Sequence, residues 1–164
     1  MKYDKILKKI GLLLLSFTLM TSFVSCEDDD LSPEPSGILT DDARGTWVVD
    51  MYWDGDFYDT NTISIYNTGD NDDKIWIDDL GHGWGLFAKA DFNTNTLTIS
   101  ATDADELYYG VTVTINGKIT KGDATTPSGD IVDSIYFEVE FSDIPGEIWV
   151  YEGYKSTAKI EDYP

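Results

Sequence analysis

His82, the only histidine in the chain, and two carboxylates before it are the residues whose types could support catalysis. A histidine can act as the base of a Ser/His/Asp set, and the glycines of Gly81-His82-Gly83-Trp84-Gly85 would allow a substrate to approach the backbone. Asp78 and Asp79 could form the acid/base pair of a glycosidase. The competing interpretation, which we favour, is a turn histidine and carboxylates that are neighbours by chance. The sequence contains no Gly-x-Ser-x-Gly elbow and no glycine-rich phosphate loop.

Acidic residues also suggest a cation site, but the spacing is incomplete. Asp70, Asp72 and Asp73 have the alternating oxygen donors of a calcium loop. They lack the glycine and the terminal glutamate that an EF-hand loop requires. We therefore interpret this segment as a solvated hairpin turn and expect neither a metal nor a cofactor.

Aromatic residues are abundant, with five Trp, ten Tyr and seven Phe. Some fall on the polar phase of alternating segments, where core packing does not explain them. Aromatic rings on the outer face of a sheet can stack on sugars or offer a flat apolar surface to a partner. The sequence therefore predicts an outer-face ligand-binding set; the alternative is that these strands are covered on both sides. The members of the set are Tyr66, Trp76, Tyr136, Trp149 and Tyr151.

Alternation with a period of two residues dominates the chain and is typical of half-buried strands. The clearest case has Ile135, Phe137, Val139 and Phe141 on one face and polar residues between them. Ile148 and Val150 show the same pattern, which predicts that they face inward. The predicted strands are 46–53, 61–66, 73–78, 84–91, 96–101, 110–116, 118–122, 132–142 and 147–160.

Short turns between successive strands predict an all-β fold in which neighbours in sequence are neighbours in space. Asn116-Gly117 suits a two-residue hairpin, because both residues tolerate a positive φ. Eight or nine such strands must close or stack to hide their edges. We expect an antiparallel up-and-down β-barrel, lipocalin-like (calycin-like), with a two-sheet β-sandwich as the alternative.

The first 25 residues predict export. Lys2, Lys5, Lys8 and Lys9 precede an apolar run from residue 10 to residue 24, which suits a signal peptide better than a membrane-spanning helix. The run ends at Phe23-Val24-Ser25-Cys26, which resembles a bacterial lipobox. Cys26 is the only cysteine, and acylation would explain an unpaired thiol in an exported protein. Several acyl chains on Cys26 would anchor the chain to a membrane.

These features divide the chain into a signal peptide (1–25), a lipidated acidic tether (26–40) and a single barrel domain (41–164). Without residues 1–25 the chain has seven basic and 30 acidic residues. Such a charge disfavours nucleic acid as a partner. The acidic run Glu27-Asp28-Asp29-Asp30 resembles the surface-export signal of gut-type Gram-negative anaerobes. We expect an outer-membrane lipoprotein exposed at the cell surface, with a periplasm-facing one as the alternative.

Several stretches together carry a family resemblance. They are Trp47 to Trp53, Tyr66-Asn67-Thr68, Lys74-Ile75-Trp76-Ile77-Asp78-Asp79-Leu80-Gly81, Asn116-Gly117-Lys118, 122–129 and Asp133-Ser134-Ile135. With these segments the chain resembles the family named "lipid-binding putative hydrolase", small lipoproteins of gut-type Gram-negative anaerobes. The resemblance implies a lipocalin-like barrel and an apolar ligand, and it supplies no catalytic residues.

We therefore expect non-catalytic binding of a small apolar, lipid-like molecule in a barrel interior lined by the aliphatic phase. One alternative is a hydrolase that acts on an ester or glycoside through His82 or an acidic pair. Another is a glycan-binding accessory protein of an outer-membrane uptake complex.

Overall fold

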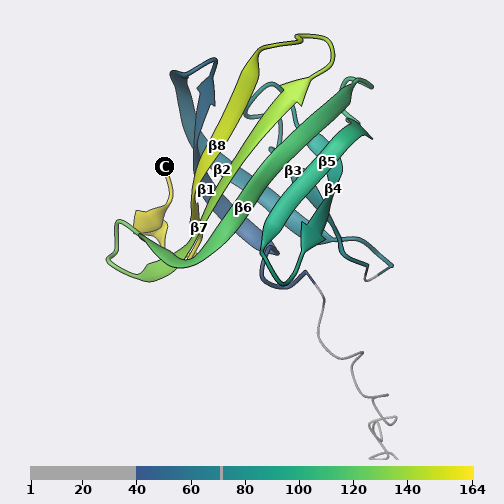
Figure 1. Cartoon of the computed structure of the whole chain (residues 1–164). Helices are drawn as coiled ribbons and strands as arrows, with labels where there is room; N and C mark the ends of the chain where they lie inside the picture. The colour runs from purple at the N-terminus through teal and green to yellow at the C-terminus, as the bar shows by residue number, and fades with distance from the viewer. Residues whose placement is uncertain (1–39, 71) are drawn as a thin grey trace, which may run out of the picture. The chain divides into compact units, whose positions relative to one another are not determined.

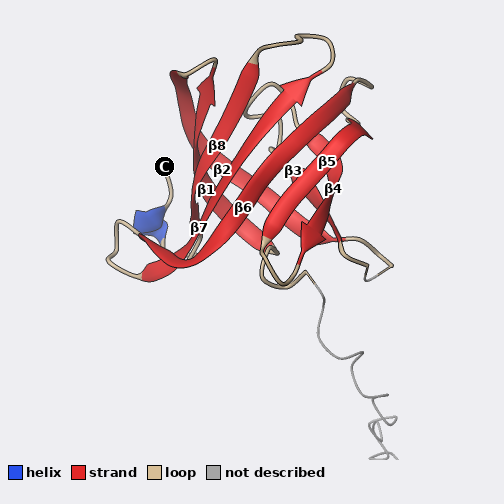
Figure 2. Ribbon diagram, in the orientation of Figure 1, coloured by secondary structure: helices blue, strands red, loops and turns tan. Residues whose placement is uncertain are grey.

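The computed structural model describes residues 40–70 and 72–164, in which eight antiparallel strands form one closed barrel (Figure 1). Each strand pairs with the next in sequence, and β8 pairs with β1, so the topology is up-and-down. The strands are β1 (Gly45–Trp53), β2 (Asp56–Asn67), β3 (Lys74–Asp78), β4 (Phe87–Asn93), β5 (Thr98–Asp105), β6 (Thr112–Thr125), β7 (Ile131–Phe141) and β8 (Ile148–Lys155). A short 3-10 helix, η2 (Ile160–Asp162), follows β8 (Figure 2).

The predicted lipocalin-like barrel is thus confirmed over the sandwich. Closure removes the unpaired edges that an open sheet of eight strands would expose. The predicted signal peptide, Cys26 and the tether up to residue 39 lie outside the described residues.

Apolar side chains on the inward phase fill the barrel. The alternation predicted for β7 is confirmed, because Ile135, Phe137, Val139 and Phe141 are buried. Inside the barrel the rings of Phe137 and Tyr151 stack with centroids 4.7 Å apart and planes 6° apart. A barrel of eight strands has an interior just wide enough for such side chains to fill it. The buried cluster is continuous around the barrel, with members from every strand.

Two of the predicted strands are a single strand. Residues 110–116 and 118–122 were predicted to be joined by a hairpin at Asn116-Gly117, and that prediction is wrong. Both residues lie within β6, where Asn116 pairs with Ser100 and Glu138, and Gly117 pairs with Ile99 and Phe137. Neighbours on both sides keep this segment extended, so no turn forms.

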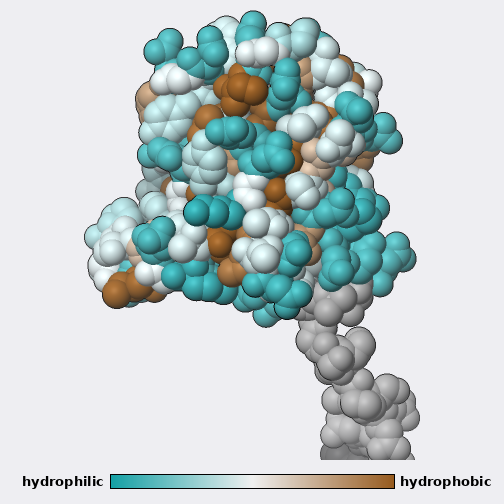
Figure 3. All heavy atoms as spheres, in the orientation of Figure 1, coloured by the Kyte–Doolittle hydropathy of each residue, from teal (hydrophilic) through white to brown (hydrophobic). Residues whose placement is uncertain are grey.

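Hydrophilic side chains cover most of the outer wall. Figure 3 shows this for the face over β6, β7 and β8, where hydrophobic colours occur only in separate patches. On β7 the outward residues include Tyr136 and Glu138, both exposed. Polar residues on one phase and apolar residues on the other are what a barrel wall facing water requires.

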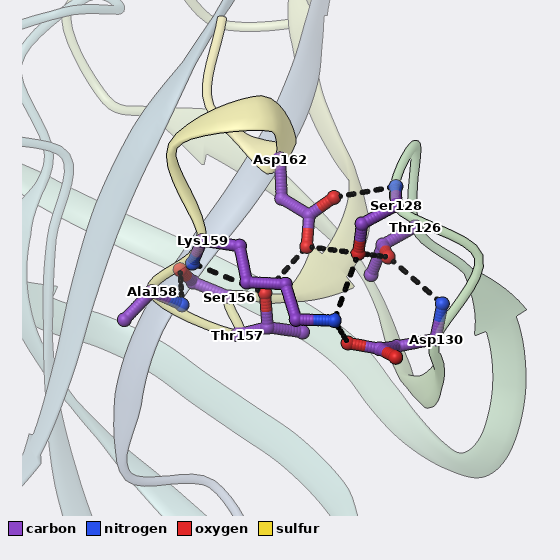
Figure 4. Close-up of polar contacts among 8 residues, drawn as sticks. All are labelled: Thr126, Ser128, Asp130, Ser156, Thr157, Ala158, Lys159 and Asp162. Carbon is purple, nitrogen blue, oxygen red and sulfur yellow. Dashed lines mark hydrogen bonds and ion pairs between the residues drawn. The ribbon is translucent and has the colours of Figure 1, made fainter.

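Polar contacts hold the C-terminal segment against the β6–β7 loop at the lower end of the barrel in Figure 1 (Figure 4). The buried carboxylate of Asp162 accepts hydrogen bonds from Ser128 N (2.7 Å), Ser128 Oγ (2.9 Å) and Thr157 Oγ1. Lys159 Nζ donates to Asp130 at 2.5 Å. Burial raises the pKa of Asp162, but the hydrogen bonds from Thr157 and Ser128 outweigh it, and the pKa lies below its ordinary value of 3.8.

Asp162 is therefore expected to stabilise the fold in a pH-dependent way. Because its pKa is lower in the folded state, its contribution is fully present above about pH 3.8 and is lost as the pH falls through the folded value. Asp162→Asn should lower the melting temperature at neutral pH and have little effect once the wild-type carboxyl is protonated. Melting curves from neutral to acidic pH test this, with the exposed neighbour Glu161→Gln as the control. An equal deficit at every pH would contradict it.

Candidate functional site

Four connections surround the upper end of the barrel in Figure 1, which we call the mouth. They are the turn 54–55 and the loops 79–86, 106–111 and 142–147. The chain enters β1 at the other end, through residues 40–44. The mouth thus lies at the end of the barrel away from its N-terminal entry.

Aromatic rings gather at the mouth around Trp149. The Trp149 ring stacks on Trp53, with centroids 6.2 Å apart and planes 16° apart. Tyr58 meets it edge-on at 5.0 Å, and Trp84 lies at 6.4 Å. Trp149 is only 2% exposed, whereas Trp53, Tyr58 and Trp84 are 44%, 51% and 37% exposed. We call these four residues the mouth cluster. It consists of the buried indole of Trp149 and three exposed aromatic rings around it.

The buried indole nitrogen of Trp149 has no hydrogen-bond partner among residues 40–70 and 72–164. An unsatisfied buried donor costs about 1–3 kcal/mol. The neighbouring indole differs, because Trp53 Nε1 donates to Glu147 Oε2 at 2.8 Å. The mouth cluster therefore contains a donor that an acceptor atom from outside the protein could satisfy.

Asp79 holds the 79–86 loop across the mouth. Its buried carboxylate accepts hydrogen bonds from the N–H groups of Gly81 (2.8 Å), Gly83 (3.2 Å) and Gly85 (3.2 Å), and from Tyr151 Oη (3.1 Å). A Cβ added to Gly83 would lie 2.5 Å from Tyr151 Oη, so only glycine lets the loop pack this closely. Burial, and then the charge of Asp79, raise the pKa of Tyr151 well above its ordinary value. The phenol is therefore a neutral donor to the carboxylate.

Glu106 orders the loop 106–111 in the same way. Its buried carboxylate accepts hydrogen bonds from the N–H groups of Phe87 (3.1 Å), Tyr108 (2.7 Å) and Tyr109 (2.8 Å). The ordered loop brings Tyr109 beside Trp84, and together with Val111 and Asp143 these residues line a groove of about 330 Å³. The groove extends the exposed aromatic surface of the mouth.

The predicted catalytic residues do not come together. Asp78 and Asp79 are consecutive and point to opposite sides of the wall: Asp79 is buried, and Asp78 accepts a hydrogen bond from Tyr108 Oη at 2.7 Å on the outside. That hydrogen bond, with burial, raises the pKa of Tyr108 to about 12. His82 Nδ1 lies 3.0 Å from the carbonyl oxygen of Thr62. No hydrogen bond among the described residues joins the His82 ring to a hydroxyl or carboxylate.

Two members of the predicted outer-face set are placed wrongly. Trp149 and Tyr151 are 2% and 0% exposed and point into the barrel, while Ile148 and Val150 face outward and are half-buried. Tyr151 tolerates burial because its hydroxyl reaches Asp79, and Trp149 because the rings of the mouth cover it. The prediction that Ile148 and Val150 face inward therefore assigned the two faces of this strand the wrong way round.

Tyr66, Trp76 and Tyr136 do lie on the outward phase. The Trp76 ring contacts Phe87 at 5.1 Å between centroids, and Lys89 Nζ lies 5.0 Å from its centre. Trp76 borders a groove of about 410 Å³. Tyr136 lies on another, of about 530 Å³, and donates to Glu138 at 2.5 Å, a hydrogen bond that raises its pKa to about 12. A glycan contact at these residues stays a prediction.

The sequence interpretation missed the residues that form the mouth. Trp53 continues the inward phase of β1, but it is the last residue of that strand and is 44% exposed. Tyr58, Trp84 and Tyr109 are in loops or at the start of a strand, where alternation gives no information. The available signal was the density of aromatic residues near strand ends.

The described residues, 40–70 and 72–164, contain no group of three or more His, Cys, Asp or Glu side chains placed to hold a metal ion. Within the same ranges, no helix has both the length and the apolar composition needed to cross a membrane.

A closed up-and-down barrel of eight antiparallel strands defines a lipocalin-like fold. Comparison with known families gives the class a name: residues 32–159 match the family described as lipid-binding putative hydrolase. The match covers most of the chain, and the protein belongs to this family. Comparison with curated proteins finds no match.

Proposed function

We propose that the protein binds a lipid-like molecule, without catalysis, at the mouth of its barrel. The observation that carries this proposal is the mouth cluster, in which three exposed rings surround a buried indole. Exposed aromatic surface gains nothing for folding, and a contiguous patch of it is typical of a binding site. Membership of a lipid-binding family supports an apolar ligand.

The mouth is a better candidate than the barrel interior. The interior was the expected site, but its apolar side chains form one continuous buried cluster with members from every strand. A lipid chain could enter only by displacing them. The groove beside Trp84 and Tyr109 is already open to solvent. Binding there requires less rearrangement.

Removing two exposed rings of the mouth should weaken lipid binding. We expect the double variant Trp53→Ala/Trp84→Ala to bind the neutral apolar dye N-phenyl-1-naphthylamine about tenfold more weakly, a loss of about 1.4 kcal/mol. Dye fluorescence rises in an apolar environment, so a titration measures the affinity. Trp76→Ala, which removes an indole from the outer wall, is the matched control and should bind as the wild type does.

Equal affinity of the double variant and the wild type would contradict the mouth as the binding site. The rival function, a hydrolase, makes a different prediction in the same preparations. Turnover of ester or glycoside substrates by the wild type, abolished in His82→Ala, would overturn non-catalytic binding.

The proposal includes an anchored location at the outer membrane, with the barrel exposed at the cell surface. It is supported by the basic start, the apolar run and the lipobox-like sequence that ends at Cys26, the only cysteine in the chain. A mouth at the end away from the N-terminal entry would stay accessible when the chain is tethered through Cys26.

Cys26→Ser should accumulate as a precursor that keeps its signal peptide, because lipoprotein processing requires the acylated thiol. Metabolic labelling with a fatty-acid analogue should mark the wild type and not the variant, and mass spectrometry should show the difference in length. A processed variant that still fractionates with outer membranes would contradict lipidation at Cys26.

A further inference from the structure

The connections that surround the mouth carry acidic residues and no Lys or Arg. Asp54, Asp143 and Glu147 lie in the turn 54–55 and the loop 142–147. Asp79 and Glu106 are buried beneath the loops, and backbone N–H groups rather than cations satisfy them. Apart from the imidazole of His82 in the 79–86 loop, the ionisable Asp, Glu, Lys and Arg side chains of these connections are therefore all acidic.

The basic residues of the barrel lie elsewhere. The ion pairs among the described residues use Arg44, Lys74, Lys121 and Lys159, at the other end of the barrel or on its outer wall. Lys89, the basic residue nearest to these loops along the chain, directs its ammonium group over the outward-facing Trp76 ring. A carboxylate or phosphate at the mouth would therefore meet like charges, with no Lys or Arg of these connections to offset them.

Trp149 adds a second requirement. Its buried indole N–H lacks an acceptor among the described residues, and the rings of Trp53, Tyr58 and Trp84 surround it. A donor in this position is satisfied by an oxygen and not by an ammonium group, which is itself only a donor. Because this nitrogen is buried, a bound molecule must displace part of what covers it to reach it.

We infer that the mouth selects an uncharged amphiphile whose carbonyl or hydroxyl oxygen accepts a hydrogen bond from Trp149 Nε1, and that it excludes anionic lipids. The inference rests on the proposed function and names the class of molecule for that site. The apolar chain lies against the exposed rings of the mouth. The negative loops discriminate against free fatty acids and acidic phospholipids, and the indole N–H discriminates against groups without an acceptor.

Three amphiphiles with the same twelve-carbon chain test this: monolauroylglycerol (neutral), laurate (anionic) and dodecyltrimethylammonium (cationic). Each is titrated calorimetrically into the wild type below its critical micelle concentration, at a pH where laurate is ionised. We expect monolauroylglycerol to bind about tenfold more tightly than laurate. Added salt should narrow that gap, since it screens repulsion between exposed charges.

Trp149→Phe keeps a buried ring and removes the donor. It should weaken the binding of monolauroylglycerol about fivefold and leave the affinity for dodecyltrimethylammonium unchanged. Trp76→Phe, the matched change on the outer wall, should alter neither. The comparison of three amphiphiles in the wild type does not depend on whether the variant folds.

The outcomes separate the inference from the proposed function. Laurate that binds as tightly as monolauroylglycerol would overturn the inference and leave lipid binding in place. Tighter binding of dodecyltrimethylammonium than of the other two would also overturn it, because the mouth would then be an aromatic site for cations. Absence of binding by all three would instead contradict the proposed function.

Discussion

Replacing Trp149 by alanine is expected to lower the free energy of unfolding by about 3–5 kcal/mol. The side chain is 2% exposed and contacts three other rings, so its removal leaves a large cavity beneath the mouth. The change also removes an unsatisfied N–H, which offsets part of the loss. Urea denaturation followed by circular dichroism measures the difference.

Trp76→Ala removes the same side chain from the outer wall and serves as the control. Trp76 is half-buried, and its ring contacts Phe87 and Lys89 on the outer wall. Its loss should cost about 1 kcal/mol or less, as is usual for a change at the surface. If the two substitutions had the same small effect, Trp149 would face outward after all, and the mouth cluster would not exist.

The orientation of β8 shows where alternation stops being informative. Its sequence, Ile148-Trp149-Val150-Tyr151, is apolar on both phases, so a period of two residues cannot decide which phase faces inward. Sequence interpretation favoured the aliphatic pair. The structure buries the aromatic pair instead, because Tyr151 finds Asp79, which is 72 positions away in the chain. That partner is not visible from the strand alone.

Turn chemistry was informative only together with its context. Asn116-Gly117 and Asp54-Gly55 are the same kind of dipeptide, yet only the second forms a hairpin. Asp54 and Gly55 have φ values of 48° and 88°, as a two-residue turn requires. Asn116-Gly117 lies between two pairing strands, so ladder hydrogen bonds keep it extended. The barrel could be predicted because the other strands alternate clearly, as β7 does with its polar outward phase.

The candidate site could be predicted much less well than the fold. Its rings come from the β1–β2 hairpin, the 79–86 loop and β8, and only barrel closure brings β8 beside β1. The sequence shows an excess of aromatic residues but not which of them meet. Asp79 was singled out as an acid, and the structure gives it a different task, since it holds the loop that carries Trp84.

Gly153→Ala is expected to destabilise the barrel by about 3 kcal/mol or more, at the upper end for an overpacked site. Gly153 lies on β8 opposite Val49, at the seam where the last strand pairs with the first. A Cβ at this position would lie 1.9 Å from the carbonyl oxygen of Val48 and 2.7 Å from Val49 Cα. Both are backbone atoms and cannot move aside without separating β1 from β8. The methyl group should therefore open the seam.

Gly69→Ala is the matched control, because a Cβ there meets nothing within 4 Å and the backbone φ is not positive. It should change stability by less than about 0.5 kcal/mol. Hydrogen exchange distinguishes opening of the seam from general destabilisation. In Gly153→Ala the amides that join β1 to β8 should lose more protection than those that join β3 to β4. Uniform loss of protection would contradict opening at the seam. Stability equal to that of the wild type would contradict this closure, since the two strands would then be farther apart than their pairing requires.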